Sequence, residues 1–399
     1  MSELPSLDLL RGMTDEQVLS AVMDHGRATR AELASLTGLS KPTVSDAVRR
    51  LAESGALVQT GERSTGRGRA GTYYSLHPDV GHALVATIAP QGIVAEALDA
   101  FGDVRARKAA ELSRPTSRGE VADALASVGS ALADELGAGG GFGVAAVSAA
   151  DPVDRGSGRL VHLPDAPFLV GDLDPCRVLT PLVSGPVCVD NDVNWAARAE
   201  AKSGRADGST NFVYLHLGEG LGVALVNDGV VQRGGHGLAG EIAHVVVAGP
   251  GDVAMPFTDV FAALDLRRPG STAIDVPKLV AALSAPDRDV ANVLTRAVRG
   301  ILAACVALAD PDMVVVSGDW GAEPAFVAPL SEAFAPHPRH LPLLPPTVTS
   351  EPALVGARDE ALSMLRRDII EGARSSGSRL SVGRSSVVRA TVDEDSEGP

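Results

Sequence analysis

Residues 26–57 have the sequence GRATRAELASLTGLSKPTVSDAVRRLAESGAL, which contains the start signals of two short helices and the turn between them. Thr29 followed three residues later by Glu32 is a capping box, which predicts the start of the first helix. Gly38 supplies the backbone freedom for a tight turn, and Ser40 can cap the second helix. In that second helix the apolar side chains recur at the spacing of one buried face. They are Val44, Ala47, Val48 and Leu51.

A further helix is predicted upstream of this stretch. Thr14 and Gln17 form another capping box, and the apolar pattern that follows stops near His25 and Gly26. Three helices with a glycine-containing turn before the last one match the helix-turn-helix arrangement, whose last helix can enter the major groove of DNA. Any three small amphipathic helices share this periodicity, so a plain helical domain is the alternative.

A β-ribbon is predicted directly after the helices. Leu57–Thr60 and Thr72–Leu76 have the composition of short strands, and the segment between them, GERSTGRGRAG (61–71), is rich in glycine and arginine. Such a wing places arginine against phosphates or in a minor groove. A solvated basic linker is the alternative interpretation.

The charge distribution supports a local rather than a general affinity for nucleic acid. The net charge of −15 disfavours phosphate binding by the whole surface. Between residues 40 and 70, however, six Lys or Arg residues stand against three Asp or Glu residues. The residues predicted to contact DNA are Ser40, Lys41, Thr43, Ser45, Arg49, Arg50, Arg67 and Arg69.

The bulk composition indicates more than one domain in a soluble protein. The chain has 399 residues and is 45% hydrophobic, which exceeds what one core usually holds. The first residues lack a signal-peptide pattern and no stretch has about 20 uninterrupted apolar residues, so we expect a cytoplasmic protein without a membrane partner. The three cysteines lie far apart without metal-ligand or disulfide spacing.

From Gly81 onward, apolar strands alternate with Ala-rich helical stretches, which predicts an α/β fold. Strands are predicted at Ala83–Ile88, Ile93–Asp99, Gly143–Val147, Phe212–Leu217, Val223–Val226 and Met313–Ser317. Helices are predicted at Arg118–Leu136, Val193–Ser203, Ala291–Leu308 and Val355–Glu371.

The stretch 26–57, followed by TGRGRAG, closely resembles the DNA-binding domain of regulators in the ROK family (repressors, open reading frames and kinases). Three later segments resemble the same family: VDNDVNWAARAE (189–200), the segment from His216 to His244 that contains GLAGEIAH, and DPDMVVVSGDW (310–320). The resemblance implies a winged helix-turn-helix followed by a two-lobed, actin-like, sugar-kinase-like domain. It also implies that four residues face sugar hydroxyls, namely Asn191, Asp192, Glu241 and His244.

The resemblance leads us to expect three parts in this chain. Residues 1–79 form the winged helix-turn-helix domain, and residues 80–371 form the ROK domain. Residues 372–399 are rich in Ser, Gly and Arg and then acidic, which predicts a disordered tail.

This chain departs from the kinase pattern of the family at the phosphate-binding and zinc-binding segments. Where ROK kinases carry DxGGTK, it has ATIAPQG (86–92), with Thr87 in place of the aspartate and Pro90 in place of a backbone donor. Glu219 replaces the usual threonine of the second phosphate loop, and no cysteine follows His244 where members commonly carry CxCGxxGC. We therefore expect no phosphoryl transfer, no cofactor and no zinc.

These observations favour a DNA-binding repressor that acts on carbohydrate-related genes. The expected partners are a roughly two-fold double-stranded DNA operator, a sugar or sugar-derivative effector, and further copies of the chain in a dimer or tetramer. Two alternatives stay open: a bifunctional sugar kinase in which Asp192 is the general base, and a regulator whose cleft residues are inherited scaffold that binds nothing.

Overall fold

The computed structural model describes residues 7–63, 71–113, 116–137, 141–163, 171–339 and 341–385, with side chains described from residue 10 to residue 374. The N-terminal domain contains three helices and a three-stranded sheet of order β1-β3-β2. Its elements are α1 (Leu7–His25), β1 (Ala28–Thr29), α2 (Arg30–Thr37), α3 (Lys41–Glu53), β2 (Leu57–Arg63) and β3 (Thr72–Leu76). This is the predicted winged helix-turn-helix.

The local signals in residues 26–57 are confirmed. The Thr29 hydroxyl accepts a hydrogen bond from the Glu32 backbone at 3.3 Å, and the Glu32 carboxylate accepts one from the Thr29 backbone at 2.7 Å. Gly38 ends α2 with φ of 70°, and the Ser40 hydroxyl caps α3 by accepting from the Thr43 backbone at 3.3 Å. All four residues of the predicted apolar face of α3 are buried.

The predicted start of the first helix at Thr14 is wrong. Helix α1 extends back to Leu7, and the Thr14 hydroxyl donates to the Leu10 carbonyl at 2.8 Å. A threonine inside a helix can satisfy its hydroxyl in this way, so the same residue type occurs both at caps and within helices.

The two lobes downstream repeat one sheet topology. The first lobe has the strand order β6-β5-β4-β7-β8, and the second has β11-β10-β9-β14-β15. In each lobe the first three strands are antiparallel and the later strands run parallel to the first. The predicted strands and helices of the α/β region are all present, with ends that shift by a few residues except for the last helix, which continues 14 residues beyond its predicted end.

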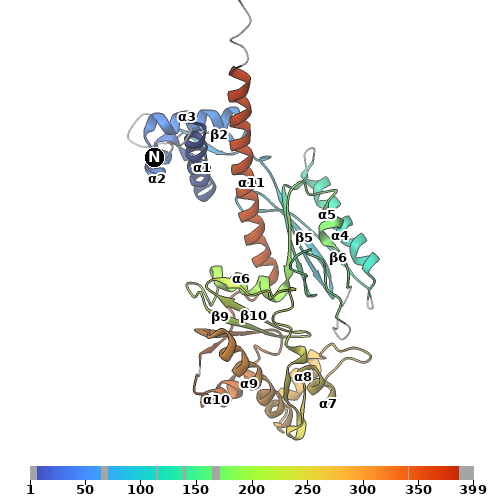
Figure 1. Cartoon of the computed structure of the whole chain (residues 1–399). Coiled ribbons are helices and arrows are strands. Elements are labelled where there is room, and N and C mark those ends of the chain that lie inside the picture. Colours follow the sequence, from blue (N-terminus) through green and yellow to red (C-terminus); the bar gives the residue numbers. More distant parts are fainter. Residues whose placement is uncertain are drawn as a thin grey trace, which may run out of the picture.

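The first lobe packs helices on both faces of its sheet (Figure 1). Its elements are β4 (Ala83–Ala89), β5 (Gly92–Leu98), β6 (Val104–Glu111), α4 (Arg118–Leu136), β7 (Val144–Ala149), α5 (Pro175–Leu179) and β8 (Val187–Asn191). One face packs against α4 and α5, and the other packs against α11 (Pro352–Ser385).

The second lobe is built around α6 (Asp192–Ser203) on one face of its sheet and α9 (Asp289–Ala309) on the other. Its strands are β9 (Phe212–Leu217), β10 (Leu221–Asn227), β11 (Val230–Val231), β14 (Met313–Ser317) and β15 (Leu343–Leu344). The remaining elements are η1 (Ile242–His244), β12 (Val246–Ala248), η2 (Pro250–Asp252), β13 (Ala254–Pro256), α7 (Phe257–Ala263), α8 (Val276–Leu283) and α10 (Pro324–Phe334). Among the described helices, α9 has the length and composition to cross a membrane, but most of it is buried in the core of this lobe.

Helix α11 connects the lobes to the N-terminal domain (Figure 1). Leu365 and Ile369 of α11 belong to the same hydrophobic core as Val18 and Val22 of α1. Arg366 donates to the Met23 carbonyl at 3.0 Å and pairs with Asp24 at 3.2 Å. The helix-turn-helix is therefore packed against the last helix of the chain as well as joined to the first lobe by sequence.

The expected tail is wrong over residues 372–385, because α11 continues as a helix to Ser385. Residues 386–399 lie outside the described part of the chain. Packing on α1 explains the first turn of this extension: Gly12 of α1 lies against the Arg374 side chain, and Arg374 pairs with Glu16.

A buried carboxylate fixes α11 on the sheet of the first lobe. Glu96 on β5 is 1% exposed and accepts from Arg358 of α11 at 2.5 and 2.7 Å, while Arg107 of β6 donates to it at 2.7 Å. We expect Glu96→Ala to lower the free energy of unfolding by about 2–4 kcal/mol, since it leaves the Arg358 guanidinium without its anion and removes one of the two carboxylates, Glu96 and Glu351, that Arg107 contacts. Chemical denaturation measures this, with Glu111→Ala at an exposed position of β6 as the control. A loss no larger than that of the control would contradict the role of Glu96.

Candidate functional site

The exposed side of α3 carries most of the residues predicted to contact DNA. Lys41 and Arg49 are exposed, and Thr43 and Ser45 are half-buried on the same helix. The Ser40 and Thr43 hydroxyls lie 2.7 Å apart and bond to each other, so both first serve the helix start. Arg67 and Arg69 lie outside the described residues.

The two arginines in the middle of α3 have different surroundings. Arg49 makes an exposed ion pair with Asp46 at 2.8 Å, which contributes little to stability and can be exchanged for another anion. Arg50 instead reaches α1 and holds Asp15 with two contacts of 3.2 and 2.5 Å. Asp15 is 13% exposed at its side chain, so Arg50 joins two helices of the domain and lies apart from the other candidates.

The wing is supported by arginines that the sequence analysis did not single out. Arg27 lies over the Tyr73 ring at 5.1 Å from its centroid, and Arg30 lies over Tyr74 at 4.9 Å. Arg27 also pairs with Glu62 of β2. These contacts orient β2 and β3 relative to α2.

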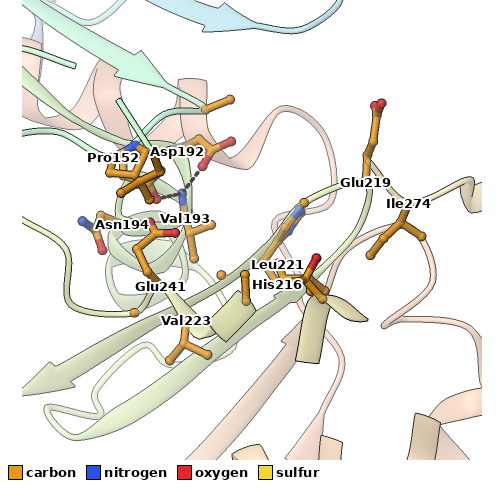
Figure 2. A pocket seen from close by; sticks show the side chains of 18 of the residues that line it. Pro152, Asp192, Val193, Asn194, His216, Glu219, Leu221, Val223, Glu241 and Ile274 are labelled. Carbon is orange, nitrogen blue, oxygen red and sulfur yellow. Dashed lines mark hydrogen bonds between the residues drawn. The ribbon is translucent and has the colours of Figure 1, made fainter. Parts of the chain in front are cut away.

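The four residues predicted to face a ligand all line one cleft between the lobes. Asn191, Asp192, Glu241 and His244 border a cavity of about 230 Å³. The cavity lies where β8 of the first lobe runs into α6 and where the loops after β9 and β14 meet it. Figure 2 shows Asp192, Asn194 and Glu241 grouped at one end of it.

Asn191 and Asp192 are placed by the start of α6. The Asn191 side chain caps the helix by accepting from the Val193 backbone at 2.9 Å, and its amide donates to the carbonyls of Ala149 and Asp151 at 3.3 Å each. The Asp192 carboxylate accepts from the Val193 backbone at 2.8 Å. The Asn191 side chain thus forms its hydrogen bonds within the fold, and the Asp192 carboxylate lines the cleft beside it.

Glu241 and His244 follow a segment that approaches other backbone closely. At Gly240, with φ of 99°, an added side chain would meet the Val223 carbonyl at 1.8 Å, so glycine is required there. The Glu241 backbone donates to the Leu238 carbonyl at 3.3 Å, but its carboxylate forms no hydrogen bond to any other described residue, and His244 is exposed at the end of η1. Burial and the nearby Asp192 raise the pKa of Glu241 to about 7. Burial also raises the pKa of Asp192, although His216 opposes that effect.

The structure adds cleft residues that the sequence analysis missed or treated as ordinary. His216 is the last residue but one of β9 and lies near Asp192, and Asp319 follows β14. Strand β14 is parallel to β9, with Ser317 opposite His216. Asp319, two residues after Ser317, therefore lies at the same end of the sheet as His216. Their positions at strand ends that border a cleft are the signal that would have identified them.

The segments that would bind phosphate in a kinase have other shapes here. Pro90 and Gln91 form the two-residue turn between β4 and β5, and Gly92 follows it against the Ala110 carbonyl. The Glu219 carboxylate pairs with Arg268 at 3.3 Å, and its backbone carbonyl accepts from Ile274 at 3.1 Å.

The residues after His244 do not fit a zinc ion. They form β12, η2 and β13, a short hairpin that contains no cysteine. Over the described ranges, no group of three or more His, Cys, Asp or Glu residues is placed to hold a metal ion.

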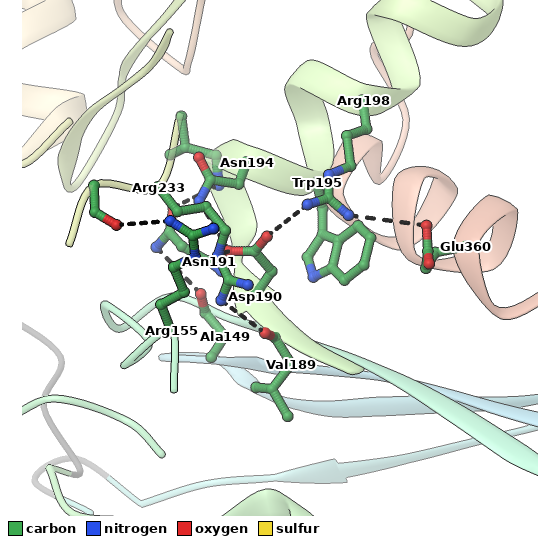
Figure 3. A network of polar contacts seen from close by, with 12 residues as sticks. Ala149, Arg155, Val189, Asp190, Asn191, Asn194, Trp195, Arg198, Arg233 and Glu360 are labelled. Carbon is green, nitrogen blue, oxygen red and sulfur yellow. Dashed lines mark hydrogen bonds and ion pairs between the residues drawn. The ribbon is translucent and has the colours of Figure 1, made fainter. Parts of the chain in front are cut away.

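A buried polar network lies directly behind the cleft (Figure 3). Asp190, 1% exposed, accepts from Asn194 and Arg198 at 2.9 Å each and pairs with Arg233 at 3.3 Å. Arg233 comes from the second lobe and also donates to the Val189 carbonyl of β8 at 3.2 Å. Arg198 stacks over Trp195 and lies 3.9 Å from Glu360 of α11. This network links both lobes and α11 at the base of the ligand cleft.

The raised pKa of Glu241 predicts a pH-dependent cost in stability. The folded pKa lies above the usual 4.5, so the folded state retains a proton that the unfolded chain has lost between pH 4.5 and 7. Stability therefore falls as pH rises through this window, and the full cost is present above pH 7. We expect Glu241→Gln to be more stable than the parent by about 1–3 kcal/mol at pH 8 and equally stable at pH 4.5.

Thermal unfolding across this pH range measures the effect of Glu241→Gln. The matched control is Glu332→Gln on the exposed side of α10, which should leave the pH profile unchanged. A variant that gains no stability at pH 8 would show that the Glu241 carboxyl is well solvated.

Comparisons with known proteins agree with this architecture. Residues 14–58 match the winged helix-turn-helix DNA-binding family, and residues 91–258 match the ROK family. The xylose repressor of Caldicellulosiruptor bescii is 26% identical over 252 residues, which is 61% of each chain. The chain thus spans about three fifths of the length of the curated repressors that it matches.

Two solved structures share the fold. A crystal structure described as a ROK family transcriptional regulator, homolog of the E. coli Mlc protein, aligns with a TM-score of 0.62 at 17% identity and covers 92% of this chain and 98% of its own. The ROK hexokinase from Thermus thermophilus aligns with a TM-score of 0.52 at 23% identity, over 69% of this chain and 96% of its own. Residues 91–258 therefore carry a ROK family domain, and a winged helix-turn-helix domain precedes it in the chain.

Proposed function

We propose that this protein is a cytoplasmic DNA-binding transcription regulator, acting as a repressor of carbohydrate-related genes. The observation that carries the proposal is the joint presence of a winged helix-turn-helix with an exposed polar face on α3 and a polar ligand cleft, connected by α11. The xylose repressor that it resembles points to the same class of target gene.

The DNA-binding part of the proposal rests on α3 and the wing. Lys41 and Arg49 project from the exposed face of α3, and Thr43 and Ser45 accompany them near its N-terminal end, where a recognition helix meets base edges. Arg67 and Arg69 of the wing are proposed phosphate or minor-groove contacts on the sequence alone. The Ser40 hydroxyl caps α3 and lies on the side of the domain proposed to face DNA. Arg50 pairs with Asp15 inside the domain, so we do not assign it a DNA contact.

The cleft is proposed to bind a ligand without phosphoryl transfer. A proline and a glutamine occupy the first turn in place of glycine donors, and the Glu219 carboxylate in the second loop would face a polyanion. At an effective dielectric near 20, a like-charge contact at about 4 Å costs roughly 4 kcal/mol. Arg268 pairs with the Glu219 carboxylate and so offsets part of its negative charge, but in that pair it is not available to bind a phosphate.

The size of the cleft favours a small polar ligand. Its volume of about 230 Å³ is below the roughly 300–1,000 Å³ of pockets that hold drug-sized ligands. Asp192, Glu241 and His244 supply acceptors and donors suited to hydroxyl groups, with Asn191 positioning the start of α6. A single sugar or sugar derivative therefore suits the site better than a sugar together with a nucleotide.

The regulatory step is proposed to pass through the Asp190 network to α11. Arg233 from the second lobe and Arg198 both bind Asp190, and Arg198 lies near Glu360. A ligand that prefers one arrangement of the lobes would shift these contacts, and α11 would transmit the shift to α1. In a dimer or tetramer on a two-fold operator, this changes the distance between recognition helices.

DNA binding is tested by Arg49→Ala in the full chain. Loss of one cationic contact should weaken operator affinity roughly tenfold and reduce the slope of log affinity against log salt by about one. The control is Arg296→Ala, an exposed arginine of α9 that also pairs with an aspartate, Asp252, far from α3. Fluorescence anisotropy on duplexes recovered by genomic footprinting supplies both numbers. Equal affinity of the parent and Arg49→Ala would remove α3 from the DNA interface.

A bifunctional sugar kinase is the second candidate, favoured by the position of Asp192 in the cleft. We expect titration with ATP and magnesium to give no measurable heat, and hexoses to release no ADP, because the phosphate loops are altered. Sugar-dependent ADP release that disappears in Asp192→Asn would establish the kinase instead.

A further inference from the structure

The described walls of the cleft carry a one-sided set of charges. Four carboxylates from four separate segments line it, together with two histidines. The carboxylates are Asp192, Glu219, Glu241 and Asp319. None of the described lining residues is lysine or arginine. The cleft therefore presents negative charge to whatever enters it.

Little in the fold compensates this charge. Arg268 pairs with Glu219 at 3.3 Å and does not itself line the cavity. Over the described residues, the side chains of Asp319 and Glu241 form no hydrogen bond or ion pair, while the Asp192 carboxylate accepts from the Val193 backbone and also interacts with the Asn191 side chain. Buried carboxylates that lack a cationic partner are costly, and the raised pKa of Glu241 reports the same deficit.

A metal ion does not supply the missing charge. Among the described residues no three His, Cys, Asp or Glu side chains converge on one point, so the acidic groups are spread along the cleft. Figure 2 shows Asp192 and Glu241 at one end and Glu219 at the other, with His216 between them. An ion needs convergent oxygens, whereas an extended organic molecule can meet separated groups one by one.

We propose that the cleft binds a polyhydroxylated ligand that carries a protonated amine, an amino sugar, and rejects phosphorylated or carboxylated sugars. The inference rests on the proposed function, because it assigns the chemical class of the effector in the same cleft. The ammonium group lies between Asp192 and Glu241, where its three donors meet two acceptors that the fold leaves available. The hydroxyl groups face His216 and the rest of the cleft.

The apolar part of the wall is consistent with this orientation. Pro152, Leu221, Val223 and Ile274 line the same cavity, so part of its wall is apolar. In such surroundings a charge-assisted hydrogen bond is stronger than one between neutral groups. A neutral sugar would leave the two carboxylates without compensation, and an anionic sugar would add to the repulsion.

The test uses isothermal titration of the full-length protein at pH 7.5 with matched ligand pairs. Glucosamine, galactosamine and mannosamine are compared with glucose, galactose and mannose, and glucose 6-phosphate and glucuronate serve as anionic probes. At least one amino sugar should bind tenfold or more tightly than its parent hexose. N-acetylglucosamine, which keeps the substituent but loses the charge, should bind no better than glucose.

Two variants separate charge from shape. Glu241→Gln and Asp319→Asn should each reduce the preference for the amine, measured as the ratio of amino-sugar affinity to parent-hexose affinity in the same variant, and Glu241→Gln should reduce it at least fivefold. Glu332→Gln on α10 should retain the full preference. Thermal unfolding of each variant confirms that it is folded.

The outcomes distinguish this inference from the proposed function. If hexoses bind as tightly as amino sugars, or if glucose 6-phosphate binds, the ligand class is wrong while a sugar-responsive regulator stands. Retention of the preference in Glu241→Gln would also overturn the assignment. If no sugar binds and operator affinity does not respond to any of them, both the ligand class and the effector role fall.

Discussion

Burial of the apolar side of α11 is the constraint on which the rest of the structure depends. Its residues Leu365 and Ile369 share a core with α1 of the N-terminal domain, and Leu354, Ala357 and Ala361 share that core with the sheet of the first lobe. Burial of this much apolar surface is the main favourable term that holds the two parts together. Because one continuous helix forms both contacts, the DNA-binding domain cannot shift without a matching change along α11.

The duplicated sheet topology explains why polar residues gather in one cleft. Each lobe has parallel strands, and ligands in open α/β sheets bind beyond the carboxyl ends of such strands. Strand β8 ends in Asn191, β9 in the loop with Glu219, and β14 just before Asp319. The same framework can serve a kinase or a sensor, since the outcome is decided by the side chains in these loops rather than by the strands.

Local signals made the helix-turn-helix predictable, and long-range contacts account for what was missed. Thr29, Gly38 and Ser40 act within a few residues of their own positions, so their roles follow from the sequence. Thr14 looks the same in sequence but lies inside α1, and Arg50 looks like Arg49 until α1 places Asp15 beside it. Whether a side chain on a helix packs inside the domain or stays exposed depends on neighbours that are distant in the sequence.

In the cleft and in the tail, too, some features could be predicted from the sequence and others depend on long-range contacts. Asp192 and Glu241 were identified through a family resemblance, whereas His216 and Asp319 come together only because β9 and β14 pair in register. Residues 372–385 have a composition rich in Ser and Gly that disfavours a helix, yet α11 continues through them. Contact of its Arg374 with α1 supplies tertiary packing for the first turn of this extension.

The acidic network around the cleft also indicates how a small ligand can influence a distant helix. Asp190 near the end of β8 and Asp192 at the start of α6 are separated by one residue and have different surroundings: Asp190 lies in the network with Arg198 and Arg233, and Asp192 lines the cleft. A ligand that moves Asp192 therefore acts on a backbone that Asp190 fixes to both lobes. Glu360 adds α11 to this group through Arg198, and α11, with 34 residues, is about 50 Å long at 1.5 Å per residue. From Glu360 to Arg374 at the contact with α1, this helix rises about 20 Å, so a rotation at the network would displace α1 through that lever, which is the physical basis of the proposed coupling between the cleft and the DNA-binding domain.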